Sequence, residues 1–265
     1  MDFRVRRTGS EQPHPKTTIR FRRNKGRYEG HSDLEVQRAT VKDVDFGRTA
    51  FRHFLSVGSK FERCSFDEAT FEAGSLSLAP QSLFRECTFR GSDLRNIDLG
   101  QARFEECLFE AALIRDWASD AAEFVGCRFS GKVEDSRFSG RPWGMWAEPG
   151  YLNPVRTRNE FRENDFRAAE IIGTDFVWGV DVHAQLFPKS EDYVLLDRWH
   201  DRVARAIRVI EDWVEPDRSE ARILIGVYTD PGYEEQASVF IHKWSLDIPR
   251  HIAGRVWDLL AVSLP

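Results

Sequence analysis

Methionine, cysteine and long apolar runs are all scarce in this 265-residue sequence, which has 2 Met and 4 Cys against 20 Phe. No stretch approaches the roughly 18 consecutive apolar residues that indicate a transmembrane helix. The opening residues, MDFRVRRTGS, lack the apolar core of a signal peptide. We therefore expect no membrane association and a cytoplasmic location, where cysteines are normally free thiols.

Motifs typical of catalysis and metal binding are missing as well. The sequence contains no HExxH pair, no GxSxG, no P-loop and no GxGxxG. Its 7 histidines are scattered and no CxxC pair occurs, so ligands at the usual zinc spacing are not available. We expect no catalytic residue, no bound metal and no cofactor, and a protein that is not an enzyme.

The charge is small in total but unevenly distributed. The formal net charge is −5, yet residues 1–30 carry 9 Lys or Arg and 3 Asp or Glu. Residues 44–188 carry 17 basic and 23 acidic residues, a net −6. The mild total does not favour direct binding of nucleic acid. Residues 1–30 are predicted to be a basic arm that contacts phosphate or, as the favoured alternative, a cap on the domain that follows.

Every cysteine lies in a Phe-x-x-Cys-x-Phe segment. The four segments are FERCSF (61–66), FRECTF (84–89), FEECLF (104–109) and FVGCRF (124–129). They place at equivalent positions Cys64, Cys87, Cys107 and Cys127, and Phe61, Phe66, Phe84, Phe89, Phe104, Phe109, Phe124 and Phe129. The last three segments are 20 residues apart, and the first precedes the second by 23. Such regular spacing indicates a structural repeat.

Within this repeat, large apolar residues recur every five positions, from Val36 to Leu76 and from Phe84 to Phe129, usually with a small residue two positions earlier. A period of five matches neither a helix nor a plain strand. It predicts a chain that turns a corner every five residues and stacks residues 20 apart in columns, about 4.7–4.9 Å from coil to coil. The interior should then contain a ladder of thiols beside two ladders of Phe rings. Thiols that point the same way suit neither tetrahedral metal binding nor a relaxed disulfide, so we expect them to be structural.

Irregular positions in the repeat are also informative. Where the large position holds only Ser56 or Ser119, the position two residues earlier holds Phe54 or Trp117, which could fill the missing volume. The phase shifts by three residues around 78–80. After a break it returns at Phe161, Phe166, Ile171 and Phe176, with Leu186 as the final candidate.

The units resemble those of the pentapeptide-repeat family, whose consensus is Ala-(Asp/Asn)-(Leu/Phe)-x-x. Representative matches are GSDLR (91–95), NIDLG (96–100) and QARFE (101–105). The resemblance covers roughly residues 34–188 and implies a mainly β fold, a right-handed, four-sided parallel β-helix. We assign residues 31–188 to this domain.

An insertion at 139–158, SGRPWGMWAEPGYLNPVRTR, breaks the repeat. It must leave the coil and return to it. Trp143, Trp146 and Tyr151 are candidate anchors for a partner, since aromatic residues are enriched in binding hot spots. The alternative, which we favour slightly, is that they fold back and cover apolar surface of the rod.

Residues 189–265 lose the five-residue period and are predicted to form a separate α-β-β-α module. A helix should begin near Ser190 and end before Pro216, and a second helix should cover 248–263. The segments 221–228 and 237–244 read as two strands joined by a turn. We expect this module to be a cap, a homodimerisation element or the functional part of the protein.

Function is less well determined than fold. The favoured hypothesis is a scaffold that binds a protein partner through its outer faces, the 139–158 loop or the C-terminal module. The resemblance implies an alternative, protection of DNA gyrase or topoisomerase IV from quinolones or toxins by an acidic rod that mimics DNA. A third hypothesis places an effector activity in the module.

The DNA-mimicry hypothesis makes a testable statement about surface charge. It requires a continuous acidic stripe, whereas a surface of mixed charge favours a scaffold. The candidate residues for the stripe are Glu62, Glu72, Asp93, Asp98, Glu105, Glu106, Glu110 and Asp116. Among them we select Glu105, Glu106 and Glu110 as candidate contacts for a partner.

Overall fold

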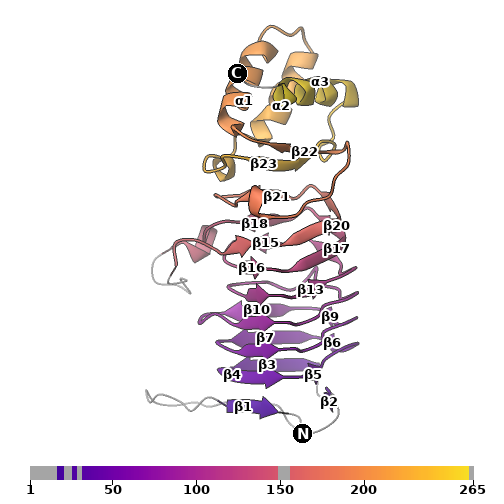
Figure 1. Cartoon of the computed structure of the whole chain (residues 1–265), viewed down its shortest axis with the longest axis vertical. Coiled ribbons are helices and arrows are strands. Elements are labelled where there is room, and N and C mark those ends of the chain that lie inside the picture. The colour runs from indigo at the N-terminus through magenta and orange to yellow at the C-terminus, as the bar shows by residue number, and fades with distance from the viewer. Residues whose placement is uncertain (1–16, 21–25, 29–31, 149–155, 263–265) are drawn as a thin grey trace.

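The computed structural model describes residues 17–20, 26–28, 32–148 and 156–262. It is a rod of stacked coils with a helical module at its C-terminal end, and the described N-terminal strands lie at the opposite end (Figure 1). Within the described residues, no helix is long and apolar enough to cross a membrane.

Parallel strands from successive coils build the sheets of the rod. The largest sheet has the order β1 (Thr17–Arg20), β4 (Ala39–Lys42), β8 (Lys60–Glu62), β11 (Leu83–Arg85), β12 (Arg103–Glu105), β16 (Glu123–Val125) and β19 (Phe161–Arg162). A second sheet contains β3 (Asp33–Gln37), β7 (His53–Val57) and β10 (Gly74–Leu78). A third contains β13 (Leu108–Phe109), β14 (Ile114–Arg115), β17 (Arg128–Glu134) and β20 (Asp165–Ile172).

Shorter pairs complete the coils. A further sheet contains β15 (Ala118–Ser119), β18 (Arg137–Ser139) and β21 (Asp175–Val177). Two-stranded pairs join β2 (Gly26–Arg27) to β5 (Val44–Asp45) and β6 (Ala50–Phe51) to β9 (Thr70–Phe71). Three 3-10 helices are η1 (Gly144–Trp146), η2 (Val182–Ala184) and η3 (Pro231–Tyr233). The fold is therefore a parallel β-solenoid; its right-handedness and its four sides remain predictions.

The strand register confirms the 20-residue coil. Phe84 is opposite Phe104, and Phe104 is opposite Phe124. Phe61 is opposite Phe84, 23 residues later, which shows that the three extra residues near position 80 are absorbed inside one coil. The second column has the same register, with Phe109 opposite Phe129.

Phenylalanine rings fill the interior as predicted. In the first column, ring centroids are 4.6 Å apart for Phe61 and Phe84, 5.2 Å for Phe84 and Phe104 and 5.0 Å for Phe104 and Phe124. In the second column, the ring of Phe109 stacks between two others at 5.0 and 4.9 Å. The fully buried Phe residues of the two columns are Phe61, Phe66, Phe84, Phe89, Phe104, Phe109, Phe124 and Phe129. Each ring thus packs on the coil above and the coil below, which is how a repeat buries a continuous core.

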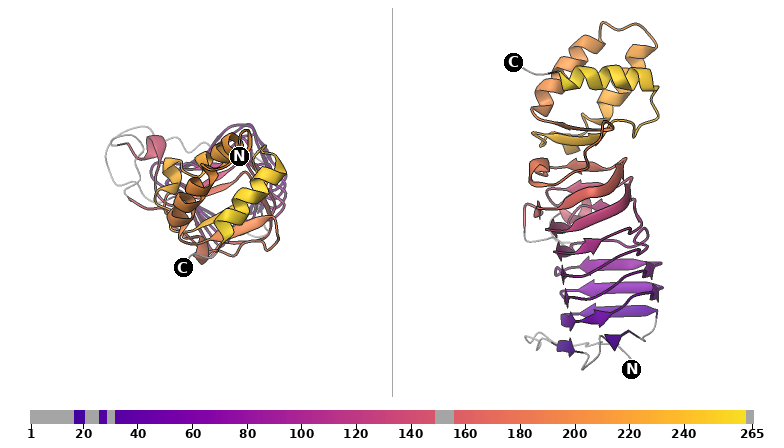
Figure 2. Two further views of the ribbon diagram at one scale, coloured as in Figure 1. Left: turned by 90° about the horizontal axis from the view of Figure 1, so that it is seen from above. Right: turned by 45° about the vertical axis from the view of Figure 1, so that its right-hand side comes forward.

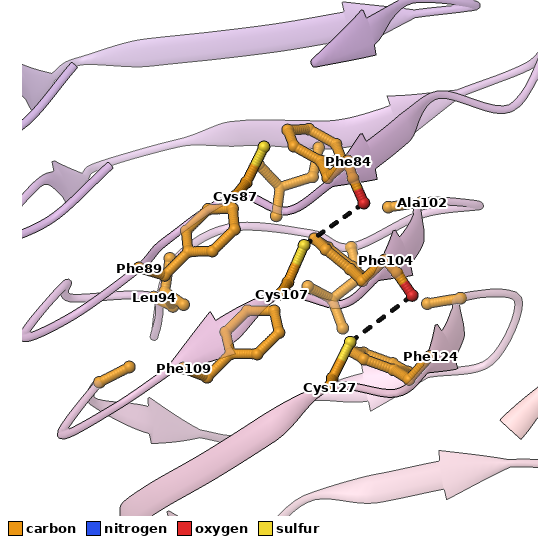
Figure 3. Close-up of a cluster of buried hydrophobic side chains, with 14 of the residues drawn as sticks. Phe84, Cys87, Phe89, Leu94, Ala102, Phe104, Cys107, Phe109, Phe124 and Cys127 are labelled. Carbon is orange, nitrogen blue, oxygen red and sulfur yellow. Dashed lines mark hydrogen bonds between the residues drawn. The ribbon is translucent and has the colours of Figure 1, made fainter. Parts of the chain in front are cut away.

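The predicted thiol ladder is present beside the rings (Figure 3). Its members are Cys64, Cys87, Cys107 and Cys127, all buried and free. The Cys107 thiol donates to the Phe84 carbonyl at 3.3 Å, and the Cys127 thiol donates to the Phe104 carbonyl at 3.5 Å. Burial, together with the neighbouring thiols, raises the pKa of Cys107 well above its ordinary value. These cysteines are small core residues with a weak hydrogen bond to the preceding coil.

Large side chains compensate for the two serines in the ring columns. Ser56 and Ser119 are buried, and so are Phe54 and Trp117 two residues before them. The Trp117 indole N–H donates to the Leu94 carbonyl at 2.9 Å, which satisfies a buried donor. The predicted exchange of volume between the two inward positions is confirmed.

The final inward position differs from the prediction. Leu186 is 49% exposed, whereas Phe187 is buried and stacks on Phe166 at 5.6 Å. This last coil takes up one additional residue around η2, so the inward position moves from 186 to 187. The prediction that Leu186 is an interior residue was therefore wrong.

Strands before residue 30 continue the stack at the N-terminal end. The strand β1 pairs with β4, and β2 pairs with β5. Tyr28 is buried, with its ring 5.1 Å from Phe46 and 6.1 Å from Phe51. These contacts cover the first coil, as the capping alternative requires. Most of the basic segment 1–30 lies outside the described residues.

The C-terminal module has a different element order from the predicted one. It consists of β22 (Tyr193–Leu196), α1 (Trp199–Ile210), α2 (Asp217–Val227), β23 (Val239–His242) and α3 (Arg250–Ala261), with β22 and β23 antiparallel. The strand near 237–244 and the last helix are confirmed. The predicted strand at 221–228 is helix α2, and the predicted helix from Ser190 begins only at Trp199.

The error at 221–228 has a physical origin. A short apolar run does not distinguish a strand from a buried helix. Ala221, Leu224 and Ile225 are buried at helical spacing and belong to one core cluster with residues of α1 and α3. Tertiary packing thus selects the helix. The segment 193–196 is a strand because β23, more than 40 residues away, pairs with it.

The module lies on the end of the rod (Figure 2), and aromatic side chains join the two. The Phe240 ring stacks on Phe187 with centroids 3.9 Å apart, so a module residue continues the aromatic column of the rod. The Tyr193 hydroxyl accepts a hydrogen bond from the Ile171 N–H at 3.0 Å. The module therefore covers the open end of the solenoid, where unpaired backbone would otherwise be exposed.

Candidate protein-interaction site

The predicted loop leaves the coil after β18 and returns at β19. Phe124 pairs with Phe161, 37 residues later, instead of with a residue 20 later. Tyr151, one of the three candidate aromatic anchors, lies outside the described residues. The element η1, which contains Trp146, lies beside the rod (Figure 1).

The two described tryptophans of the loop have different environments. Trp146 is buried, which agrees with the covering role, whereas Trp143 is 36% exposed. The Trp143 ring stacks on Trp178 with centroids 4.2 Å apart. The Arg141 guanidinium lies 4.2 Å from the Trp178 ring centroid and forms an ion pair with Glu235 at 2.7 Å. These contacts attach the start of the loop to the module.

A buried ionic network holds the end of the loop. Glu123 has only 6% of its side chain exposed and forms ion pairs with Arg103 and Arg156, each at 3.3 Å. Its carboxylate also accepts from the Gln81 amide at 2.8 Å and from the Glu160 N–H at 2.9 Å. Burial lowers the pKa of Arg156, although a guanidinium stays protonated in proteins.

This network is best explained as structural. A buried carboxylate needs such partners, and removing one would leave an unpaired charge. Within the described ranges, no three or more His, Cys, Asp or Glu side chains are grouped to hold a metal ion. Sequence reasoning missed the network because Glu123 occupies an outward repeat position, and only the loop that covers it makes it buried. The length of the insertion was the one available signal.

Charges on the outer face of the largest sheet alternate in sign. Lys42 is opposite Glu62, Glu62 is opposite Arg85, and Arg85 is opposite Glu105. Glu105 forms ion pairs with Arg85 and Arg103, both at 2.6 Å. Burial alone would raise its pKa, but the hydrogen bonds from the two guanidinium groups lower the pKa of Glu105 overall. Opposite charges on neighbouring strands stabilise the stack modestly.

The candidate acidic stripe is interrupted by such pairs. Ion pairs join Glu62 to Lys42, Asp93 to Arg95, Glu105 to Arg85 and Arg103, and Glu110 to Arg90. Glu72, Asp98, Glu106 and Asp116 have no ion pair within the described part of the chain. Of the three selected glutamates, only Glu106 is unpaired; it has a φ of 55° at a corner of the coil. The surface is mixed in charge, as the scaffold hypothesis predicts.

Comparison with known proteins finds only distant structural matches. No protein-family model and no curated protein sequence matches the chain. Full-length QnrB1, a plasmid-mediated fluoroquinolone resistance protein, is a similar solved structure, with 14% identity, a TM-score of 0.21 and coverage of 65% of this chain and 89% of QnrB1. One trypsin-treated QnrB1 structure matches with 14% identity, a TM-score of 0.20 and coverage of 65% of this chain and 78% of QnrB1. Another matches with 16% identity, a TM-score of 0.14 and coverage of 54% of this chain and 82% of QnrB1.

The five-residue units, the 20-residue register and the parallel stacking of inward Phe and Cys side chains decide the architecture. The chain is a parallel β-solenoid built from five-residue units. In this solenoid the interior is closed by stacked rings, so a site for a partner must lie on the outer faces, in the loop or in the module.

Exposed apolar side chains of the solenoid protein are concentrated near its C-terminal end. Between residues 33 and 138, Leu113 is the one large hydrophobic residue that is exposed, at 48%. The others are Trp143 and Met145 in the loop, Leu186 and Leu195 at the junction, and Ile207, Val209, Val214, Ile223, Val227 and Val262 in the module. Sequence reasoning missed Ile223 and Val227 because it assigned residues 221–228 to a strand.

The outer side of α2 carries two of these residues one turn apart. Ile223 is 58% exposed and Val227 is 39% exposed. Ile207 of α1 and Gly226 of α2 line a cleft of about 230 Å³ between these helices, together with the Glu211–Arg222 ion pair. We call Ile207, Ile223, Gly226 and Val227 the α1–α2 face.

Proposed function

We propose that this protein is a non-enzymatic scaffold in which the solenoid is a rigid spacer and the α1–α2 face binds a protein partner. The uneven distribution of exposed apolar residues supports this proposal most directly. Ile223 and Val227 are exposed on a stable helix, whereas the solenoid between 33 and 138 exposes Leu113 alone among its large hydrophobic residues. Exposed apolar groups that are clustered rather than scattered indicate an interaction site.

The loop is proposed as a second, separate contact surface. Trp143 is partly exposed and Met145 is 53% exposed, and the loop is attached to the module through Arg141 and Glu235. Aromatic and Met side chains are enriched at protein interfaces.

Protection of DNA gyrase or topoisomerase IV is the second candidate function. Similarity to QnrB1 is too weak to carry it, and the alternating ion pairs do not provide the dense, one-signed charge of a DNA mimic. A gyrase supercoiling and cleavage assay with a quinolone present tests it with the full-length protein. We expect no protection; protection over a wide concentration range would favour the DNA-mimicry hypothesis instead.

Affinity capture tests the proposed function. Full-length protein and two variants, Ile223→Asp and Leu113→Asp, serve as baits in lysate from cells that produce the protein, with quantitative mass spectrometry as the readout. Both residues are exposed aliphatic side chains, at 58% and 48%. We expect Ile223→Asp to lose the specifically captured protein and Leu113→Asp to retain it. Equal capture by both variants would contradict the assignment of the α1–α2 face.

Location and oligomeric state complete the proposal. We place the protein in the cytoplasm, where its four buried thiols would stay reduced. A homodimer through the C-terminal module remains a prediction, and the molecular mass in solution of the parent and of Ile223→Asp tests it.

A further inference from the structure

A groove lies at the junction of the solenoid and the module. It has a volume of about 700 Å³, and its lining includes Leu186 and Phe187 of the last coil and Lys189 just after it. Tyr193, Leu195 and Phe240 of the β22–β23 pair line it as well. The groove is separate from the α1–α2 face, with which it shares no lining residue.

The floor and walls of the groove are apolar. Phe187 and Phe240 stack with centroids 3.9 Å apart, and the Tyr193 ring lies 5.2 Å from Phe240. Leu186 and Leu195 both line the groove and are 49% and 47% exposed. Two half-exposed leucines above stacked rings form a place where an apolar side chain would lose most of its contact with water.

The backbone groups of Leu186 and Phe187, at the rim of the groove, point in different directions. The Leu186 N–H donates to the Asn164 carbonyl at 2.9 Å, and the Leu186 carbonyl accepts from the Phe166 N–H at 2.7 Å. Both groups of Leu186 therefore face the preceding coil. Phe187 comes next and precedes Pro188, which favours an extended conformation.

Successive residues of an extended chain direct their backbone groups to opposite sides. The N–H and C=O of Phe187 accordingly point away from the preceding coil, toward the module. Neither group has a hydrogen bond within the described part of the chain. A neighbouring donor and acceptor of this kind are the pair that one residue of an added extended chain would satisfy.

Positive charge lies beside the same opening. Lys189 is exposed and forms no ion pair with any described residue. Arg167 also lines the groove, but Asp165 already occupies its guanidinium at 2.8 Å. Lys189 is thus the group available to a carboxylate of an incoming ligand.

We propose that this groove binds an extended peptide segment of a partner, with an apolar side chain between Leu186 and Leu195. One peptide residue pairs with the backbone of Phe187, and an adjacent Asp or Glu contacts Lys189. A fatty acid could offer an apolar chain and a carboxylate, but it could not both donate to and accept from Phe187. This inference rests on the proposed scaffold function and adds to it a ligand class and a second site.

Selection from a random decapeptide phage library on the full-length protein provides the probe. The most enriched sequence is synthesised with a fluorescent label, and its binding is measured by fluorescence anisotropy. The variants are Leu195→Asp and Lys189→Glu, with Ile223→Asp as the matched control outside the groove. A peptide N-methylated at the residue nearest the anchor and sodium decanoate as competitor complete the set.

We expect enriched peptides to place an apolar residue next to Asp or Glu. Leu195→Asp should abolish measurable binding, Lys189→Glu should weaken it about tenfold, and N-methylation should weaken it about fivefold to tenfold, since one backbone hydrogen bond is lost. Ile223→Asp should bind like the parent, which separates this site from the α1–α2 face.

Three results would overturn the proposal: no enriched peptide, equal binding by Leu195→Asp and the parent, or displacement by decanoate at the peptide's own concentration range. The last would identify a site for apolar carboxylates. Loss of the captured partner in Ile223→Asp bears on the α1–α2 face alone, so the two proposals fail independently. Circular dichroism of Leu195→Asp confirms that any loss of binding occurs in a folded protein.

Discussion

The solenoid and the C-terminal module use their side chains in opposite ways. In the solenoid, apolar residues point inward at every fifth position, and outward charges such as Arg85 and Glu105 neutralise one another between coils. In the module, the core is irregular, and aliphatic residues such as Ile223 remain exposed. The comparison teaches that a repeat can pair its outward charges between its own coils, whereas the module leaves apolar side chains exposed that another molecule could cover.

The largest expected effect is the difference in unfolding free energy between a substitution in the solenoid interior and one at an exposed position of the module. Phe109→Ala removes a ring that stacks on two neighbouring coils, so we expect the free energy of unfolding to fall by about 3–5 kcal/mol. Ile223→Ala, at an exposed site of the module, should change it by less than about 0.5 kcal/mol. Urea unfolding of both variants measures the difference. A Phe109→Ala variant as stable as the parent would show that this column is not the core.

The reactivity of the four cysteines tests whether the interior of the solenoid is closed to solvent. All four cysteines are buried, and burial raises the pKa of Cys107, so the reactive thiolate is both inaccessible and disfavoured. We expect native protein to react with a disulfide reagent at least about a thousandfold more slowly than protein in denaturant. Mass spectrometry of the labelled protein counts the modified thiols. Rapid labelling of even one cysteine in the native state would place it outside the core.

The joint between the two regions should respond to removal of one hydroxyl. The Tyr233 hydroxyl donates to Asp175 at 2.6 Å, between the module and the last coils. Tyr233→Phe leaves the carboxyl without this donor and should cost about 1–3 kcal/mol. Hydrogen exchange should increase around η3 and β21 and remain unchanged in β8. Uniform exchange throughout the chain would argue against a local role for this bond.

Acid pH should affect two carboxyl groups of the solenoid in opposite directions, Asp175 at the joint with the module and Glu105 on the outer face. Burial raises the pKa of Asp175, so its protonated form contributes stability that is present below its unfolded pKa of about 3.9 and is lost as pH rises through the higher folded value. Although burial opposes it, hydrogen bonding lowers the pKa of Glu105, so its contribution is present above its unfolded pKa of about 4.3 and is lost as pH falls.

Single substitutions assign these two pH effects. Asp175→Asn should remove the loss of stability that occurs as pH rises above about 4, near the pKa of an unfolded Asp. Glu105→Gln should remove part of the loss of stability that occurs as pH falls below about 4, near the pKa of an unfolded Glu. Thermal unfolding from acid to neutral pH provides the readout. Parallel pH profiles for the parent and Asp175→Asn would contradict the role of Asp175.

The smallest effect is expected on the solenoid surface. Glu105→Gln at neutral pH removes two ion pairs but leaves the core intact, so the cost should be at most about 1 kcal/mol and should decrease in high salt. Chemical unfolding in low and high salt measures it. A salt-independent cost of several kcal/mol would mean that Glu105 is structurally required rather than part of a modest surface ladder.

The sequence predicted the solenoid because each coil repeats the environment of the last. Phe84 and Phe104 occupy equivalent places, and the Phe54 and Ser56 exchange followed from constant interior volume. The module offered no such internal check. Helix α2 depends on packing against α1 and α3, and the burial of Glu123 depends on a distant loop. Leu186 was misplaced because one added residue shifts the frame.

Site-specific photo-crosslinking would test the central claim most directly. A photoreactive amino acid is introduced at Ile223 of the α1–α2 face or at Leu113 of the solenoid, which are comparably exposed at 58% and 48%. Irradiation of intact cells is followed by mass spectrometry of the products. The account predicts a discrete protein adduct from Ile223 and none from Leu113. The same adduct from Leu113, with none from Ile223, would contradict it and would locate the partner on the solenoid.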